Sequence, residues 1–226
     1  MNFSINNSPS YASVTFSLDD GESIVTEKGA MISMSESISI STSSKSGGSG
    51  GVLSGVKRMF AGESFFLNEF RSKGKGEVRT APALVGDITH MSLDGSQDFA
   101  VQASSYLAST PGIRIDTKWG GFKTFFGGEG LFMLKISGIG DLFVNSFGAI
   151  YTMDIDGKYT VDTGHIVAFP KSLDFKVKKV GSWKSTLLSG EGLVCEFSGK
   201  GKIYMQTHNP PEFGKTLGKI LPPRKK

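Results

Sequence analysis

The strongest constraint on the fold is a sequence pattern that occurs three times along the chain. Each copy consists of an apolar residue, a spacer, Gly-Glu and an apolar run. The Gly-Glu pairs are Gly62-Glu63, Gly128-Glu129 and Gly190-Glu191. A Gly-x-Gly break follows each apolar run, at residues 74–76, 138–140 and 199–201. A pattern that recurs in this way indicates that the chain is built from similar structural units.

A second repeated landmark is an Asp-Gly pair ahead of a strand-like stretch. The aspartates are Asp20, Asp94 and Asp156. Asp94 and Asp156 each lie 35 residues before the glutamate of their copy, whereas Asp20 lies 43 residues before its glutamate. The Ser- and Gly-rich stretch 43–51 accounts for this excess as a loop insertion in the first copy. We therefore predict three tandem units, at about residues 10–85, 86–148 and 149–210, followed by a basic tail at 211–226.

Within the units, apolar and polar residues alternate, which is the period of a half-buried β-strand. One such alternating set is Leu193, Cys195 and Phe197. Asp156-Gly157 lies between two alternating stretches and predicts a hairpin turn. Helical patterns are limited to residues 53–60 and 211–220. The prediction is an all-β fold of three tandem antiparallel β units related by pseudo-threefold symmetry, with little helix.

The net charge of +4 lies in the C-terminal tail. Of the 25 Lys and Arg residues, five lie in the last 18 residues, beside the single acid Glu212. The rest of the chain carries 20 basic and 20 acidic residues, so its body is neutral. Because a nucleic-acid-binding domain presents a basic face on its folded body, we predict no specific nucleic-acid partner. The tail is expected to be solvated, and weak docking on an anionic membrane surface is the alternative.

No catalytic, cofactor-binding or metal-ligating set is recognisable. Residues 47–51 match the nucleophile-elbow pattern, but they lie in a Gly- and Ser-rich run that cannot hold a strained turn. His90, His165 and His208 occupy non-equivalent positions in the units and do not cluster with carboxylates in the sequence, so each is predicted to be a lone histidine that is either hydrogen-bonded or exposed, and not a metal ligand. Cys195 is predicted to be buried and unreactive. We therefore expect no enzyme, no cofactor and no metal site.

The repeat makes Glu63, Glu129 and Glu191 equivalent. On a pseudo-threefold axis these three carboxylates could bind a cation. The alternative, which we favour, is that each glutamate accepts hydrogen bonds from backbone N–H groups at the turn into its strand, or pairs with a neighbouring lysine. The same structural role at turns is predicted for the other repeated residues, which are Gly62, Gly128, Gly190, Asp20, Asp94 and Asp156.

One apolar stretch is a candidate interface. Residues 119–128 are rich in glycine and contain Trp119, Phe122, Phe125 and Phe126. If these aromatic side chains are exposed, they form an apolar patch of the kind that marks a protein–protein interface. If they are buried, they belong to the core, and this second reading is slightly favoured.

Four segments of the chain resemble a known family. They are residues 55–70, 127–132, 159–169 and 189–193. They are similar to the altered-inheritance-of-mitochondria family, and the resemblance covers roughly residues 10–208. It implies an all-β fold of tandem units like those of the tryptophan RNA-binding attenuation protein, related to double-stranded β-helix folds. It also implies that eukaryotic relatives act at the mitochondrial inner membrane, while the bacterial and archaeal members are mostly of unknown function. It supplies no catalytic residue.

These observations favour a non-enzymatic interaction or scaffold protein that forms a homo-oligomer, partly because strand edges offer a route to self-association. The first 20 residues contain no Lys or Arg and do not look like a targeting segment, so we expect a cytoplasmic protein. One alternative is a small-molecule-binding β protein or enzyme with a pocket between its sheets. The other is a peripheral membrane-associated factor that uses residues 52–60 and the basic tail and supports the integrity of membrane complexes.

Overall fold

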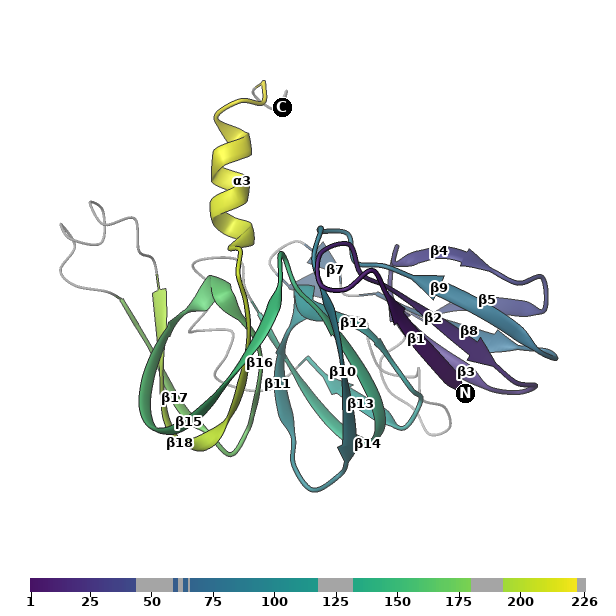
Figure 1. Cartoon of the computed structure of the whole chain (residues 1–226), viewed down its shortest axis with the longest axis horizontal. Helices are drawn as coiled ribbons and strands as arrows, with labels where there is room; N and C mark the ends of the chain where they lie inside the picture. Colours follow the sequence, from purple (N-terminus) through teal and green to yellow (C-terminus); the bar gives the residue numbers. More distant parts are fainter. Residues whose placement is uncertain (44–58, 61–62, 65, 118–131, 180–192, 223–226) are drawn as a thin grey trace.

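The computed structural model of this chain describes residues 1–43, 59–60, 63–64, 66–117, 132–179 and 193–222 (Figure 1). These residues form antiparallel β-sheets, with one α-helix, α3 (Pro210–Gly218), near the C-terminus. Two single 3-10 turns, η1 (Ala103–Ser105) and η2 (Thr163–His165), lie between strands. The prediction of an all-β fold with little helix is confirmed.

The strands repeat one pattern, which is most regular in the last third of the chain, here called unit 3. Its strands are β15 (Ile150–Asp162), β16 (Ile166–Pro170), β17 (Asp174–Lys179) and β18 (Leu193–Gln206). Strand β18 lies in the middle. On one edge of β18, strand β15 pairs with almost the whole length of β18. On the other edge, β17 pairs with the first half of β18 and β16 with the second half. A unit therefore has a long first strand, two short strands and a long closing strand.

Unit 2 has the same pattern, with its first strand divided in two. Its strands are β10 (Ile88–Asp94), β11 (Phe99–Gln102), β12 (Tyr106–Ser109), β13 (Ile113–Asp116) and β14 (Met133–Asn145). Strands β10 and β11 pair with β14 as β15 pairs with β18. Strands β12 and β13 take the places of β16 and β17.

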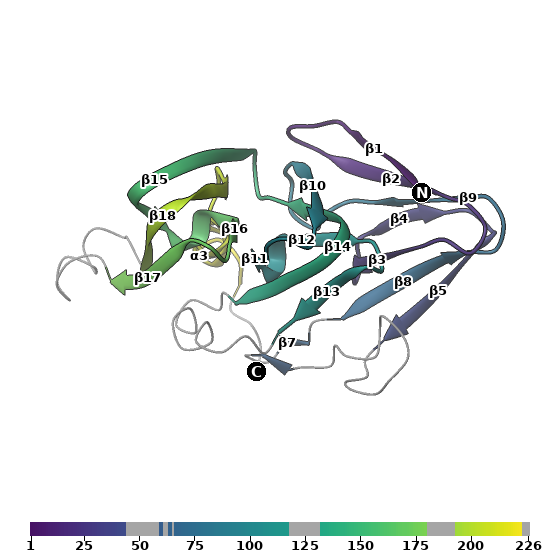
Figure 2. The ribbon, with the colours of Figure 1, turned by 90° about the horizontal axis from the view of Figure 1, so that it is seen from below.

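In unit 1 both long strands are divided. Its strands are β2 (Ser13–Leu18), β3 (Ser23–Glu27), β4 (Met31–Met34), β5 (Ile38–Ser43), β8 (Leu67–Ser72) and β9 (Gly76–Thr80). Strands β2 and β4 pair with β9, and strands β3 and β5 pair with β8. Strand β1 (Asn2–Asn6) adds to β2, and the short strands β6 (Met59–Phe60) and β7 (Glu63–Ser64) pair with each other. Figures 1 and 2 show the three units side by side in chain order.

One irregularity recurs in all three units and establishes which residues are equivalent. In each unit, the first short strand pairs with the closing strand with one residue bulged out of register. The bulged residues are Ile32 in β4, Leu107 in β12 and Val167 in β16. The next residues, Ser33, Ala108 and Ala168, are therefore equivalent as well. A turn follows at the same distance in each unit, closed by N–H donors of Ile38, Ile113 and Leu173 to the carbonyl three residues earlier.

The units share their hydrophobic cores, so the described residues form one folded domain rather than three separate ones. One cluster of buried residues joins unit 1 to Leu107 and Phe143 of unit 2. A second joins unit 3 to Ala100 and Met133 of unit 2. A third, centred on unit 2, takes in residues of both neighbours. Each boundary between units is therefore packed like a protein interior.

Two local predictions are wrong. The hairpin expected at Asp156-Gly157 does not form, because β15 continues through both residues. Gly157 lies opposite Gly199 of β18, and φ is +115° and +116° at the two positions, so the paired strands bend together instead of turning. The helix expected over residues 53–60 is contradicted at its end, since Met59–Phe60 form strand β6; its other residues lie outside the described part of the chain.

Candidate interaction interface

The junction between units 2 and 3 is a pair of strands. Strand β16 of unit 3 lies beside β11 of unit 2, with Ala168 opposite Val101 and Phe169 opposite Ala100. Just beyond this pairing, the Lys171 N–H donates to the carbonyl of Asp98 at 2.8 Å. A short strand of one unit thus extends the sheet that contains the first strand of the preceding unit.

The junction between units 1 and 2 repeats this arrangement. Strand β12 of unit 2 lies beside β3 of unit 1, with Ala108 opposite Thr26 and Ser109 opposite Val25. Ala108 is equivalent to Ala168 by the shared bulge.

Thr26 is likewise equivalent to Val101. The residues two positions further on, Lys28 and Ala103, donate matching backbone hydrogen bonds to the carbonyls of Phe66 and Phe132, at 3.1 and 3.0 Å. The two junctions therefore use the same register.

This pattern leaves one short strand without a neighbour. Among the described residues β4 pairs with β9 alone, and it ends its sheet. Its bulged residue Ile32 is 55% exposed, whereas the equivalent Leu107 and Val167 are fully buried. Met31 and Met34 are each 41% exposed. Strand β4 is therefore an apolar free edge.

The opposite end of the molecule has the complementary free edge. The second half of β15, residues 158–162, is the counterpart of β3 and β11, yet among the described residues it pairs only with β18. Tyr159 is 43% exposed there. Thr160 is also exposed, whereas both of its equivalents, Ala100 in β11 and Val25 in β3, are buried. Figures 1 and 2 both place β4 and β15 at opposite ends of the row of units.

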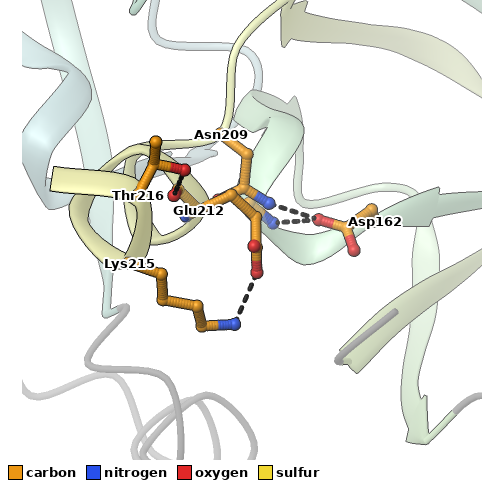
Figure 3. A network of polar contacts seen from close by, with 6 residues as sticks. Asp162, Asn209, Glu212, Lys215 and Thr216 are labelled. Atoms are coloured by element: carbon orange, nitrogen blue, oxygen red, sulfur yellow. Dashed lines mark hydrogen bonds and ion pairs between the residues drawn. The ribbon is translucent and has the colours of Figure 1, made fainter. Parts of the chain in front are cut away.

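The end of this second edge is bonded to the start of α3 (Figure 3). A carboxylate oxygen of Asp162 accepts hydrogen bonds from the Gly164 N–H, at 2.8 Å, and from the Asn209 side-chain amide, at 3.1 Å. Asn209 is the N-cap of α3, where its carbonyl oxygen accepts from the Glu212 N–H. Glu212 also pairs with Lys215 on the helix surface. The second free edge therefore ends at Asp162, whose carboxylate is held by two hydrogen bonds.

The family model described as "Mitochondrial biogenesis AIM24" matches residues 3–208. This chain belongs to that family. The resemblance found in the sequence is thereby confirmed.

A relative of the AIM24-family chain, an uncharacterized protein of Streptococcus pyogenes serotype M6, is 32% identical over 228 residues, which cover 98% of this chain and 92% of the relative. A crystal structure of a Streptococcus pyogenes protein, from a structural genomics consortium, has a TM-score of 0.76 at 27% identity and covers 97% of this chain and 99% of that one.

The predicted turn aspartates of this AIM24-family chain lie in the turn between β2 and β3 (Asp20), at the last residue of β10 (Asp94) and within β15 (Asp156). Asp20 accepts a hydrogen bond from the Gly74 N–H, and Asp94 accepts one from the Ser96 N–H, both at 2.8 Å. The Ser96 hydrogen bonds lower the pKa of Asp94. The exposed Asp156 lies 3.4 Å from the ammonium of Lys200.

The other predicted site residues are largely outside the described residues. This holds for Gly62, Gly128, Glu129, Gly190, Glu191, Trp119, Phe122, Phe125 and Phe126. Of Glu63 only the backbone is described, in strand β7. The structure therefore brings together no pair of the predicted glutamates within its described part.

The histidines and the cysteine have structural contacts. His90 pairs with Asp141 on the neighbouring strand at 2.7 Å, a carboxylate contact between residues 51 positions apart that the sequence pattern does not reveal. His165 bonds to the carbonyl of Gln206 at 2.8 Å. Cys195 is fully buried, and burial raises the pKa of its thiol to about 12, which keeps it protonated. In the part of the chain that the structure describes, no three His, Cys, Asp or Glu residues could hold a metal ion.

Sequence reasoning missed a set of equivalent polar residues at the end of the first strand, which are Glu27, Gln102 and Asp162. Gln102 is buried, and neither polar atom of its amide has a partner. Burial raises the pKa of Glu27 to about 7. Because the three residues differ in type, only the strand register reveals their equivalence.

A helix that spans a membrane must be long and apolar. Among the helices of the described residues, none has the length and apolar character needed to cross a bilayer.

Proposed function

We propose that this AIM24-family protein is a non-enzymatic, cytoplasmic scaffold or interaction protein that works as a homo-oligomer. The observation that carries the proposal is the exposure of Ile32. The same position is fully buried in units 2 and 3, where a preceding unit covers it. Among the described residues no unit precedes unit 1, and a second protein surface would complete its edge as the internal junctions are completed.

The exposed apolar surface of β4 is large enough to matter for association. Fully burying an apolar side chain of this size contributes roughly 1.5–3 kcal/mol, and the part that is still exposed at Met31, Ile32 and Met34 contributes a fraction of that each. Backbone hydrogen bonds along the strand add to this. Together they amount to several kcal/mol, which must offset an association cost of about 4–15 kcal/mol. A second contact at the other free edge, as in a closed assembly, would help to meet this cost.

The test is the native mass of the full chain, measured by light scattering on a size-exclusion column. We expect a discrete oligomer for the natural sequence. Ile32→Lys should reduce it to a monomer, because a charge would be buried in the contact. Ile220→Lys is the matched control, since Ile220 is 77% exposed and belongs to neither β4 nor β15, lying in the chain just after α3. A monomeric natural protein would refute the proposal.

A second candidate function is weak contact with an anionic membrane surface. Ile220 and Leu221, just beyond α3, are strongly exposed, and Lys215 and Lys219 lie near them. A short amphipathic segment with a few basic residues gives weak and reversible binding. Flotation with liposomes that contain anionic lipid should recover the protein at low salt and lose it for Ile220→Asp. No recovery at low salt would eliminate this candidate.

A further inference from the structure

We infer that the partner of the proposed homo-oligomer is a second copy of this chain bound head to tail, with β4 of one copy beside the second half of β15 of the next. This inference rests on the proposed function and adds which edges meet. Both internal junctions join a short strand of one unit to the first strand of the preceding one. Of the two free edges, β4 is a short strand of this kind, and the second half of β15 is part of a first strand.

The register of the contact follows from the internal junctions. Ser33 is equivalent to Ala108 and Ala168, which lie opposite Thr26 and Val101. Val161 is equivalent to Val101, because each lies two residues before a 3-10 turn. Ser33 of one copy would therefore lie opposite Val161 of the next. Met34 would then lie opposite Thr160.

The apolar surfaces also correspond. At the junction of units 2 and 3, Phe99 packs against the core cluster that includes Val167. The equivalents of these two residues are Tyr159 and Ile32, and both are exposed in the single chain. Head-to-tail pairing would bring the two together, so that each edge covers the apolar surface of the other.

Charge supports the same register. At the junction of units 2 and 3, Lys171 and Asp98 lie next to each other, joined by a backbone hydrogen bond. The corresponding residues of the two free edges are Glu36 and Lys158, both exposed. The register thus places two residues of opposite charge opposite each other, as at the junction of units 2 and 3, with the signs exchanged between the two edges.

Pairing between unlike edges has a consequence for the assembly. A contact between two identical edges would stop at a dimer and leave the other kind of edge uncovered. A head-to-tail contact leaves a free edge at each end of every partial assembly, and it therefore ends in a closed ring or continues as a filament.

The test uses two variants that each block one edge. Ile32→Lys blocks β4 and leaves β15 intact, whereas Tyr159→Lys blocks β15 and leaves β4 intact. Each variant alone should be a monomer, and an equimolar mixture should form a 1:1 dimer and nothing larger, measured by light scattering. Circular dichroism and thermal melting of each variant check that it is folded.

The outcomes separate this inference from the proposed function. If the natural protein is a monomer, both fail. If the natural protein and Tyr159→Lys are both oligomers while Ile32→Lys is a monomer, the oligomer stands and β4 meets something other than β15. A mixture of two monomeric variants that forms no dimer also overturns the inference.

A gentler pair of variants tests the register without blocking an edge. Glu36→Lys and Lys158→Glu change exposed residues, and each should weaken association at low salt by up to about fivefold. The double variant restores an opposite-charge pair and should recover the natural affinity. Equal weakening that the double variant does not repair would overturn the register.

Discussion

Strands β4 and β16 have nearly the same role in their units and opposite surroundings. Both have a bulge at the same position, and both carry a branched aliphatic residue there, Ile32 in one and Val167 in the other. Val167 is fully buried because β11 lies beside its strand, and Ile32 is exposed because no described strand lies beside β4. The difference teaches that burial in this protein depends on the neighbouring unit more than on the strand itself.

The largest expected effect is a loss of stability when Val167, in the closed junction between units 2 and 3, is changed. Val167→Lys places a charge inside a junction that is already closed, and it should lower the free energy of unfolding by more than about 4 kcal/mol. Ile32→Lys should change the stability of the isolated monomer by less than about 0.5 kcal/mol, because its side chain stays in water. Urea unfolding of both variants measures the contrast. Similar losses in the two variants would show that β4 is not a free edge.

The next effect concerns Glu27, at the end of β3 in the internal junction. Burial raises its pKa from 4.5 to about 7, so the folded protein binds a proton that the unfolded chain has released. The stability from this group is fully present below pH 4.5 and is lost as the pH rises to about 7. The loss is on the order of 3 kcal/mol.

Glu27→Gln should remove this loss and make the protein more stable at pH 8, as measured by urea unfolding at a series of pH values. Asp174→Asn is the control, because Asp174 is exposed in β17 and lies on neither free edge, and it should leave the pH profile unchanged. If Glu27→Gln has the same pH profile as the natural protein, the carboxyl of Glu27 is not desolvated by the junction.

A smaller effect distinguishes two tyrosines. The Tyr106 hydroxyl, in β12, contacts the Ser109 hydroxyl at 2.8 Å and the Val25 carbonyl at 3.4 Å across the junction with unit 1. Tyr106→Phe should cost about 1 kcal/mol in thermal or urea unfolding, because Ser109 loses a buried partner. Tyr159→Phe, on the free edge, should cost close to nothing in the monomer. Equal costs would contradict the contrast between closed and free edges.

Part of this architecture is predictable from the sequence alone. The Gly-x-Gly breaks are visible because the closing strand needs glycine where it bends; a Cβ at Gly140, for example, would lie 2.2 Å from the Thr110 hydroxyl oxygen. The alternation around Cys195 and Phe197 predicts their burial in β18, which the structure confirms. Both are local features, and local features leave a pattern in the sequence.

The rest depends on contacts between units and leaves no such pattern. Met31-Ile32 looks as apolar as Ile166-Val167, so the sequence cannot say which pair is covered. Asp156-Gly157 looks like a hairpin turn, and only the unbroken partner strand β18 shows that it is a bend. Predicted site residues such as Trp119 lie outside the described residues, and their roles stay predictions.

The most direct measurement of the central claim is a disulfide between copies. Met34→Cys and Thr160→Cys should be made in separate chains and mixed under oxidising conditions, since the register places these residues opposite each other. The natural Cys195 is buried, with the pKa of its thiol raised to about 12, and so should not interfere. We predict disulfide-linked dimers in the mixture and none in either variant alone. Dimers of Met34→Cys alone, or none in a mixture that is oligomeric by mass, would contradict the account.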